Sequence, residues 1–168
     1  MFYALSALLF IFPALAILGG VYDLTTMKIP NWISIALAIA FVPVALLVQL
    51  PWQDIAISLG LGLVALVIGI TLFAFRILGG GDAKLLAASV IWVGLSGLLA
   101  FLLTTALAGG ALSLVLLTGR KWAPLIPWSQ PAWFERLMQP KGDIPYGVAI
   151  AAGAILSFPY SQLLLKLS

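Results

Sequence analysis

The chain has 168 residues, of which 64% are hydrophobic and 8% charged, and it contains neither Cys nor His. This composition excludes a soluble domain and indicates an integral membrane protein in a lipid bilayer; the net charge of +3 is too small for a nucleic-acid-binding surface. Without thiols or imidazoles the chain offers no conventional zinc site, so any chemistry must come from carboxylates, hydroxyls, Lys or backbone. No metal and no organic cofactor is implied.

Six apolar segments are long enough to cross a bilayer, because a helix needs about 20 apolar residues to span the hydrocarbon core. In chain order they are about Phe2 to Tyr22, Trp32 to Leu50, Ile55 to Leu78, two spans within Ala83 to Gly119 divided near Gly94 to Gly97, and Pro145 to Leu165. The first lacks a basic flank and indicates a retained transmembrane helix. We therefore expect an all-α, polytopic membrane helix bundle of six transmembrane helices, forming a single membrane-embedded domain over residues 1–168.

The Lys and Arg residues predict the orientation of this bundle. If the amino terminus lies outside, the connections after the first, third and fifth helices are cytoplasmic and hold seven of the eight basic residues, with only Lys166 on the other side. The seven are Lys28, Arg76, Lys84, Arg120, Lys121, Arg136 and Lys141. We therefore expect the amino terminus outside.

The long connection over residues 120–143 combines four of these basic residues with Trp122, Trp128 and Trp133. Aromatic and basic residues together are typical of a segment that rests at the lipid headgroups. A lid that contacts the substrate is the alternative.

Two of the five acidic residues fall at the same membrane boundary. Asp23 ends the first helix and Asp82 begins the fourth, so both are expected on the cytoplasmic side although 59 residues separate them. Asp54, Glu135 and Asp143 have solvated positions in the connections. Two carboxylates that share one proton can hydrolyse a peptide bond without metal, thiol or imidazole, one acting as base toward water and the other as acid toward the carbonyl. Asp23 and Asp82 are therefore the candidate catalytic pair.

Three consecutive glycines precede Asp82, namely Gly79, Gly80 and Gly81. Lacking Cβ atoms, they permit an unwound backbone that an extended substrate could approach. Such a backbone at this depth is tolerated only where it is buried in protein or lines a wet cavity, so the triplet suggests a site as well as a turn. The alternative is a glycine loop followed by a helix cap at Asp82, with Lys84 in an interfacial ion pair. Spacing alone leaves both interpretations open.

Three blocks, in the same order, resemble those of the type IV prepilin peptidases. GGGD at Gly79 to Asp82, followed by Ala83 and Lys84, resembles their GxGD motif. YDLTTMKIPNW at Tyr22 to Trp32 resembles the segment that carries their first catalytic aspartate; by themselves Pro30 and Asn31 predict only a turn and N-cap for the second helix. KGDIPYGVAIAAG at Lys141 to Gly153 resembles the block that enters their last helix.

The resemblance implies a membrane aspartic endopeptidase of the bacterial inner membrane that removes the short basic leader of prepilins or pseudopilins at the cytoplasmic face. Asp23 and Asp82 would be the catalytic pair. Residues that would bind substrate or support the site are Gly79, Gly80, Gly81, Lys84, Pro30, Asn31, Ile144, Pro145, Tyr146 and Gly147. The chain lacks the cysteine-containing insertion of the larger bifunctional members, which implies a peptidase without methyltransferase activity, as in the compact members that serve Flp/Tad-type pili.

Three other interpretations compete with this one. A proton-coupled transporter would use intramembrane acids, but it predicts acids near the midplane and often repeated halves. A non-enzymatic assembly subunit would keep the scaffold without activity, although both aspartates and the glycines are present. An intramembrane protease of the presenilin type shares the GxGD motif but not the Ile-Pro-Asn and Ile-Pro-Tyr-Gly blocks. No oligomeric state is predicted.

Overall fold

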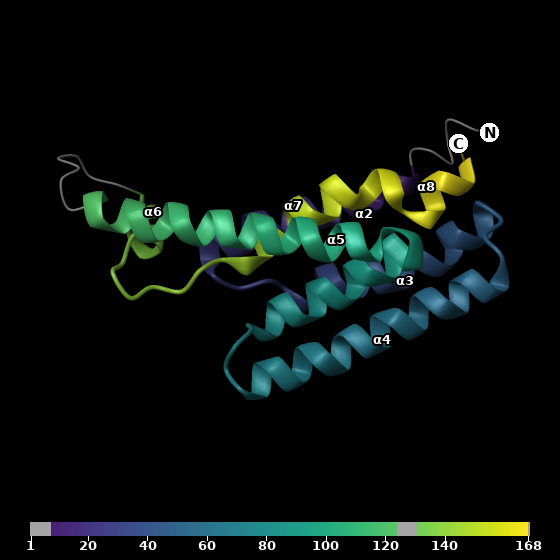
Figure 1. Ribbon diagram of the computed structural model, residues 1–168, viewed down its shortest axis with the longest axis horizontal. Helices are drawn as coiled ribbons and strands as arrows, with labels where there is room; N and C mark the ends of the chain where they lie inside the picture. Colours follow the sequence, from purple (N-terminus) through teal and green to yellow (C-terminus); the bar gives the residue numbers. More distant parts are fainter. Residues whose placement is uncertain (1–7, 124–130, 168) are drawn as a thin grey trace.

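The computed structural model describes residues 8–123 and 131–167, and these residues form helices and connections without a β-strand. The helices are α2 (Ile11–Thr26), α3 (Asn31–Leu47), α4 (Trp52–Ala74), α5 (Gly80–Trp122), α6 (Ala132–Leu137), α7 (Tyr146–Ser157), the 3-10 helix η2 (Phe158–Tyr160) and α8 (Gln162–Leu167) (Figure 1). The predicted all-α class is therefore confirmed for the described residues. The predicted start of the first span at Phe2, and Trp128 of the long connection, lie outside them.

Helices α2 and α7 pack antiparallel, which brings the end of α2 to the start of α7. The Phe12 ring near the beginning of α2 lies 6.1 Å from the Phe158 ring, and Asp23 near its end contacts Gly147. The contact between the helices is close at Gly20, where an added Cβ would lie 3.0 Å from the Ala151 Cβ. Small residues at such interfaces let helix backbones approach each other.

Helix α5 is two antiparallel helices joined at Gly94. The backbone there leaves the helical region, with φ 61° and ψ −167°, and the chain turns back (Figure 1). Before the turn Ala83 packs on Gly69 of α4; after it Gly109 packs beside Tyr146 at the start of α7. The predicted division of the long apolar run near Gly94 to Gly97 is therefore confirmed, and successive long segments alternate in direction.

Gly94→Ala is expected to destabilise the fold. Its φ/ψ region is accessible essentially only to glycine and costs other residues about 1–3 kcal/mol, and an added Cβ would overlap the Gln162 side chain. We expect a lower melting temperature in detergent, measured by circular dichroism. Gly60→Ala is the matched control, because nothing lies within 4 Å of a Cβ at Gly60. Equal melting temperatures for the two variants would contradict this description of the turn.

The buried centre of the bundle forms around Trp92. Its ring stacks on Phe12 at 5.6 Å and meets Phe41 edge-on at 5.9 Å, which ties α2 and α3 to the first half of α5. The indole N–H donates to the Leu37 carbonyl at 2.8 Å, so its polar atom is paired inside the apolar interior. This packing holds α2 and the first half of α5 together, and these two segments carry Asp23 and Asp82 at their other ends.

Within residues 8–123 and 131–167, three helical segments are long and apolar enough to cross a membrane: Trp52–Ala74, Gly80–Trp122 and Tyr146–Leu167; α2 and α3 are shorter apolar helices. The third segment corresponds to the predicted sixth span, interrupted by η2 at Phe158–Tyr160. Large apolar side chains such as Leu63 and Val67 of α4 are exposed, as expected for a surface that faces hydrocarbon. These features indicate a multi-pass membrane protein.

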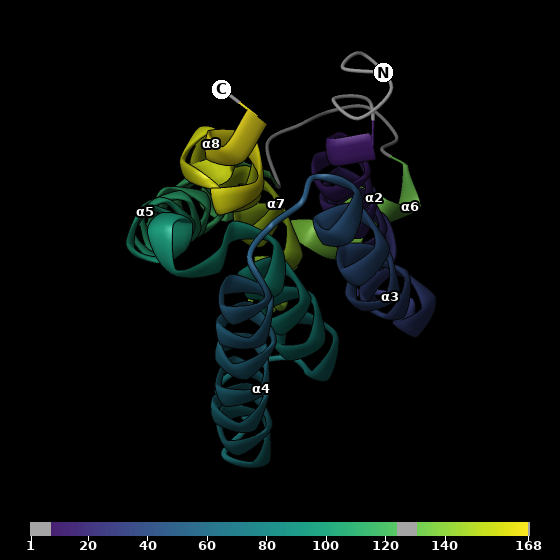
Figure 2. The same cartoon turned by 90° about the vertical axis from the view of Figure 1, so that its right-hand side faces the viewer.

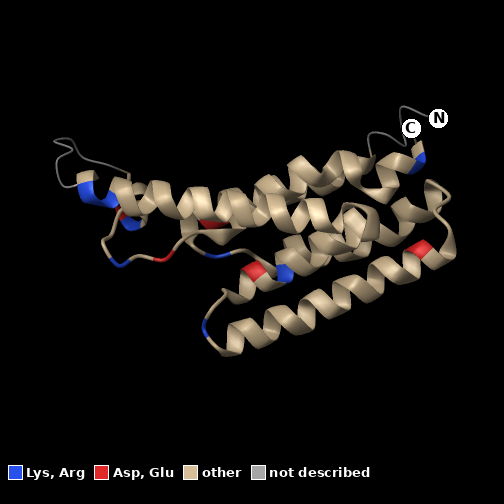
Figure 3. Ribbon diagram, in the orientation of Figure 1, with Lys and Arg blue, Asp and Glu red and all other residues tan. Residues whose placement is uncertain are grey.

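Charged residues are distributed unequally between the two ends of the bundle. Figure 3 shows Lys and Arg mostly in the half that contains α6 and the connection between α4 and α5. Lys166, in the last turn of α8, lies at the opposite end, as does Asp54 in the first turn of α4. Asp54 was expected in a loop; the helix begins earlier, at Trp52, because Pro51 with its fixed φ sits at the N-cap.

Candidate active site

The structure brings Asp23 and Asp82 together at one end of the bundle. Asp23 lies near the end of α2 and Asp82 in the first turn of α5, and they are only 6% and 8% exposed. The Asp82 carboxylate is near enough to Asp23 to interact with its charge. Two buried carboxylates close together cannot both ionise easily, because like charges repel and burial disfavours charge. Such an unfavourable arrangement is typical of functional sites.

Gly147 at the start of α7 binds this pair through its backbone. Its N–H donates to Asp23 Oδ2 at 2.7 Å, and the same amide interacts with the Asp82 carboxylate. The first amides of a helix lack partners within it, so they are available for this contact. A Cβ built at Gly147 would lie 2.8 Å from the Asp23 Cβ and 2.8 Å from Ile29 Cδ1, so only glycine fits between them.

The three glycines before Asp82 are less unwound than predicted. Only Gly79 has an extended conformation, with φ −67° and ψ 144°, because α5 already begins at Gly80. Close packing uses the missing Cβ atoms instead: at Gly79 a Cβ would lie 2.6 Å from Asp82 Oδ2, and at Gly81 it would lie 3.0 Å from the Ile29 Cβ. The expectation of an open backbone for substrate pairing is therefore wrong for two of the three glycines.

Asp82 occupies the third position of α5, not the N-cap position that Gly79 holds. Its carboxylate oxygen Oδ2 lies next to Gly79, where an added Cβ would be 2.6 Å away. The other carboxylate oxygen, Oδ1, is buried and has no hydrogen-bond partner among the described residues. Oδ2 thus lies against the start of the helix, whereas Oδ1 has no partner of its own.

Lys84 and Asn31 contact each other, in place of the ion pair and the helix cap that the alternative interpretation predicted. The Lys84 ammonium donates to Asn31 Oδ1 at 2.9 Å, and within the described part of the chain no ion pair joins Lys84 to Asp82. Pro30 is the N-cap of α3 and Asn31 its first residue, so the Asn31 side chain reaches across to α5 and makes no cap. The sequence correctly located this helix start but misassigned the side chain.

Both aspartates line two cavities, so the carboxylate pair lies between them. One cavity of ≈ 370 Å³ is lined by Asp23, Met27, Phe73, Arg76, Ile77, Leu78, Gly79, Asp82, Asp143, Ile144 and Tyr146. The other, of ≈ 360 Å³, is lined by Asp23, Met27, Lys28, Ile29, Asn31, Gly79, Gly80, Gly81 and Asp82. A water molecule needs about 30 Å³ in the liquid, so each cavity has room for several water molecules.

The third predicted block, Ile-Pro-Tyr-Gly, lies next to the aspartate pair. Ile144 and Tyr146 line the first cavity, Pro145 is the N-cap of α7, and Gly147 binds Asp23. Asp143, expected in a solvated position, is exposed but also lines this cavity. Asp143 is therefore a third acidic residue at the edge of the first cavity.

Sequence reasoning did not identify Met27 and Arg76 as site residues. Both have positive φ, 55° and 59°, where the chain leaves α2 and α4. Arg76 adds a cation to the cavity that holds the acids. The sequence offered one signal for Arg76, its position three residues before the glycine triplet. No periodic pattern predicts the positive φ values of Met27 and Arg76.

Arg120, counted from the sequence only as a basic residue, anchors the long connection. The side chain is 8% exposed, and its Nε donates to the Leu137 carbonyl at 3.0 Å and its Nη2 to the Asp143 carbonyl at 2.8 Å. Trp133 packs edge-on against Phe134 in the same connection, at 5.8 Å. Arg120 thus positions the segment that leads directly into Ile144 to Gly147.

The chain was compared with known protein families, curated proteins and solved structures. No curated protein and no solved structure matches the chain. The model of the type IV leader peptidase family matches residues 10–114, more than half of the 168 residues. The matched region contains Asp23, the three glycines and Asp82, and it ends before the Ile-Pro-Tyr-Gly block. The chain therefore belongs to the type IV leader peptidase family.

Proposed function

We propose that this protein is an aspartic endopeptidase that removes the basic leader of prepilins or pseudopilins at the cytoplasmic face of the bacterial inner membrane. The observation that carries the proposal is the burial of Asp23 and Asp82 side by side between two cavities. Membership of a leader peptidase family supports the substrate class.

In this mechanism the two aspartates share one proton and hold a water molecule. The ionised carboxylate takes a proton from the water as its oxygen attacks the scissile carbonyl, and the protonated partner donates to the carbonyl oxygen. The Gly147 amide stabilises negative charge on Asp23, and Asp82 Oδ1 has a free acceptor position. Because the pair is coupled, the proton belongs to both residues and not to one of them.

The orientation follows from the Lys and Arg residues near the acidic site. With the amino terminus outside and six spans, the end that holds Asp23 and Asp82 faces the cytoplasm. Asp143 at the edge of the first cavity adds negative charge that would attract a basic leader. The resemblance to the compact members of the family leads us to propose a Flp/Tad-type substrate and peptidase activity without methylation.

Co-expression with a leader-bearing Flp-type prepilin, followed by intact-mass analysis of the pilin, tests this function. We expect a mass loss equal to the leader, without an added methyl group, only when the protein is present. An assembly subunit or a proton-coupled transporter would leave the prepilin mass unchanged, and that result would overturn the proposal.

Arg120→Gln is expected to lower the rate of leader removal by at least about tenfold, because Arg120 makes two hydrogen bonds to the connection and each hydrogen bond from a charged group contributes about 1.5–3 kcal/mol. Arg120→Lys keeps the charge but lacks the planar fork that reaches both carbonyls, so it should restore little activity. Cleavage kinetics measure the rate of leader removal, and limited proteolysis of the 120–143 connection measures how well it is anchored. Lys121→Gln, an exposed neighbour, is the control, and a loss equal to that of Arg120→Gln would contradict the anchoring role.

A further inference from the structure

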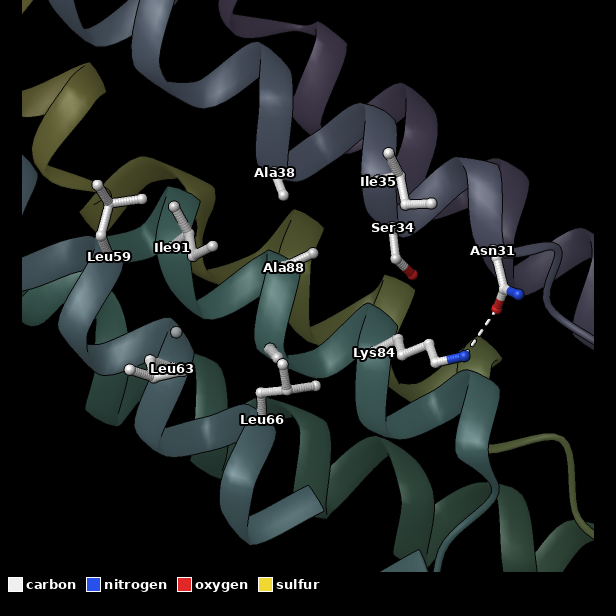
Figure 4. Close-up of a pocket in the computed structure, with 12 residues that line it drawn as sticks. Asn31, Ser34, Ile35, Ala38, Leu59, Leu63, Leu66, Lys84, Ala88 and Ile91 are labelled. Carbon is white, nitrogen blue, oxygen red and sulfur yellow. Dashed lines mark hydrogen bonds between the residues drawn. The ribbon is translucent and has the colours of Figure 1, made fainter. Parts of the chain in front are cut away.

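A third cavity, of ≈ 450 Å³, lies between α3, α4 and the first half of α5 (Figure 4). Its floor is Ala87, Ala88 and Ile91 of α5, and its walls are apolar residues of α3 and α4 such as Ala38 and Leu63. Figure 2 shows α3 and α4 diverging, with the teal ribbon of the first half of α5 between them. Along α5 the cavity runs from Lys84 to Ile91, or about 10 Å of helix.

One end of this groove is polar, and the polar groups there are donors. Lys84 has two ammonium protons beyond the one given to Asn31, and the amide nitrogen of Asn31 adds two more. The Ser34 hydroxyl, on a side chain that is 7% exposed, has no hydrogen-bond partner among the described residues. In Figure 4 this hydroxyl points into the pocket, on the side of Lys84.

The remainder of the groove suits a hydrocarbon chain. It is lined by aliphatic side chains on helices with exposed apolar surfaces, so in a bilayer its opening faces acyl chains. A void along such a surface loses dispersion contacts that a chain would supply. An anionic acceptor would pair with all three donors, and within the described part of the chain Lys84 has no carboxylate partner.

We propose that this groove binds one anionic phospholipid, with an acyl chain between α3 and α4 and its phosphate accepting hydrogen bonds from Lys84, Asn31 and Ser34. Asn31 also lines a cavity of the aspartate pair, so the bound headgroup lies next to that site. The lipid is a structural neighbour of the site, and its binding does not depend on the peptidase activity.

Native mass spectrometry of the full-length protein in detergent tests the proposal, using phosphatidylglycerol and phosphatidylcholine with identical acyl chains. We expect one phosphatidylglycerol to bind more tightly than phosphatidylcholine. Lys84→Gln should weaken it roughly tenfold, the effect of one lost charge-assisted hydrogen bond. Ala38→Phe should also exclude it by filling the groove. Lys121→Gln and Ala106→Phe, exposed positions elsewhere, are the matched controls and should bind normally.

Equal binding of the two lipids, or equal losses in Lys84→Gln and Lys121→Gln, would overturn the proposal by reducing it to general surface attraction. A second result would also overturn it: no retained phospholipid, together with Lys84-dependent binding of a synthetic leader peptide carrying its apolar segment. That outcome would make the groove a peptide site. Lys84 is exposed, so its substitution tests the site without disturbing the core.

Discussion

Asp23→Asn and Asp82→Asn are each expected to lower the rate of leader removal by about 10²–10⁴-fold, the usual contribution of a general acid or base. An amide can neither accept the proton of the attacking water nor share a proton with the remaining carboxylate. The double variant should lose little more than either single one, because the two groups act as a unit. Intact-mass analysis of the pilin over time gives the rates.

Asp54→Asn is the matched control, since Asp54 lies at the other end of α4 from the site. Its rate should stay within about twofold of the wild type, as for substitutions away from any special feature. Membrane insertion of all variants is checked by their amount in washed membranes. Full cleavage by either Asp23→Asn or Asp82→Asn would contradict the paired mechanism.

Gly147→Ala is expected to reduce cleavage about 10–100-fold although no acidic group is changed. The new methyl would lie 2.8 Å from the Asp23 Cβ and 2.9 Å from its Oδ2, which is too close for a carbon atom. Overpacking of this kind costs about 1–3 kcal/mol, and here relief requires Asp23 to move away from the amide that binds it. The rate of leader removal, compared with protein amount, measures the effect.

Gly110→Ala is the control for this substitution, because nothing lies within 4 Å of a Cβ there. It should cleave at the wild-type rate. A Gly147→Ala variant with normal cleavage and a normal melting temperature would contradict the tight contact between α7 and Asp23.

Much of the framework was predictable because it depends on local pattern. Long apolar runs predicted the helices, and the glycines near Gly94 predicted the turn that divides α5. Asp23 and Asp82 could be assigned to the same end of the bundle because alternation of direction follows from counting segments. The helix ends shifted by a few residues where Pro30 and Pro51 occupy N-caps.

The details of the site depend on contacts that no local pattern encodes. Gly147 binds Asp23 across 124 residues, and Arg120 binds carbonyls 17 and 23 residues away. The Lys84 side chain could have paired with Asp82 by spacing, but α3 offers Asn31 on the same side of α5. Such choices are decided by how the helices pack, which the sequence read alone does not specify.

Cross-linking tests most directly the claim that Asp23 and Asp82 form one site. The chain has no native cysteine, so an Asp23→Cys, Asp82→Cys variant carries just two thiols. In membranes, a short bifunctional thiol reagent should join them, adding one bridging group by intact mass. The Asp54→Cys, Asp82→Cys pair, separated by about 30 Å of α4, should add two separate groups. Two separate groups on the Asp23 and Asp82 pair would contradict the account.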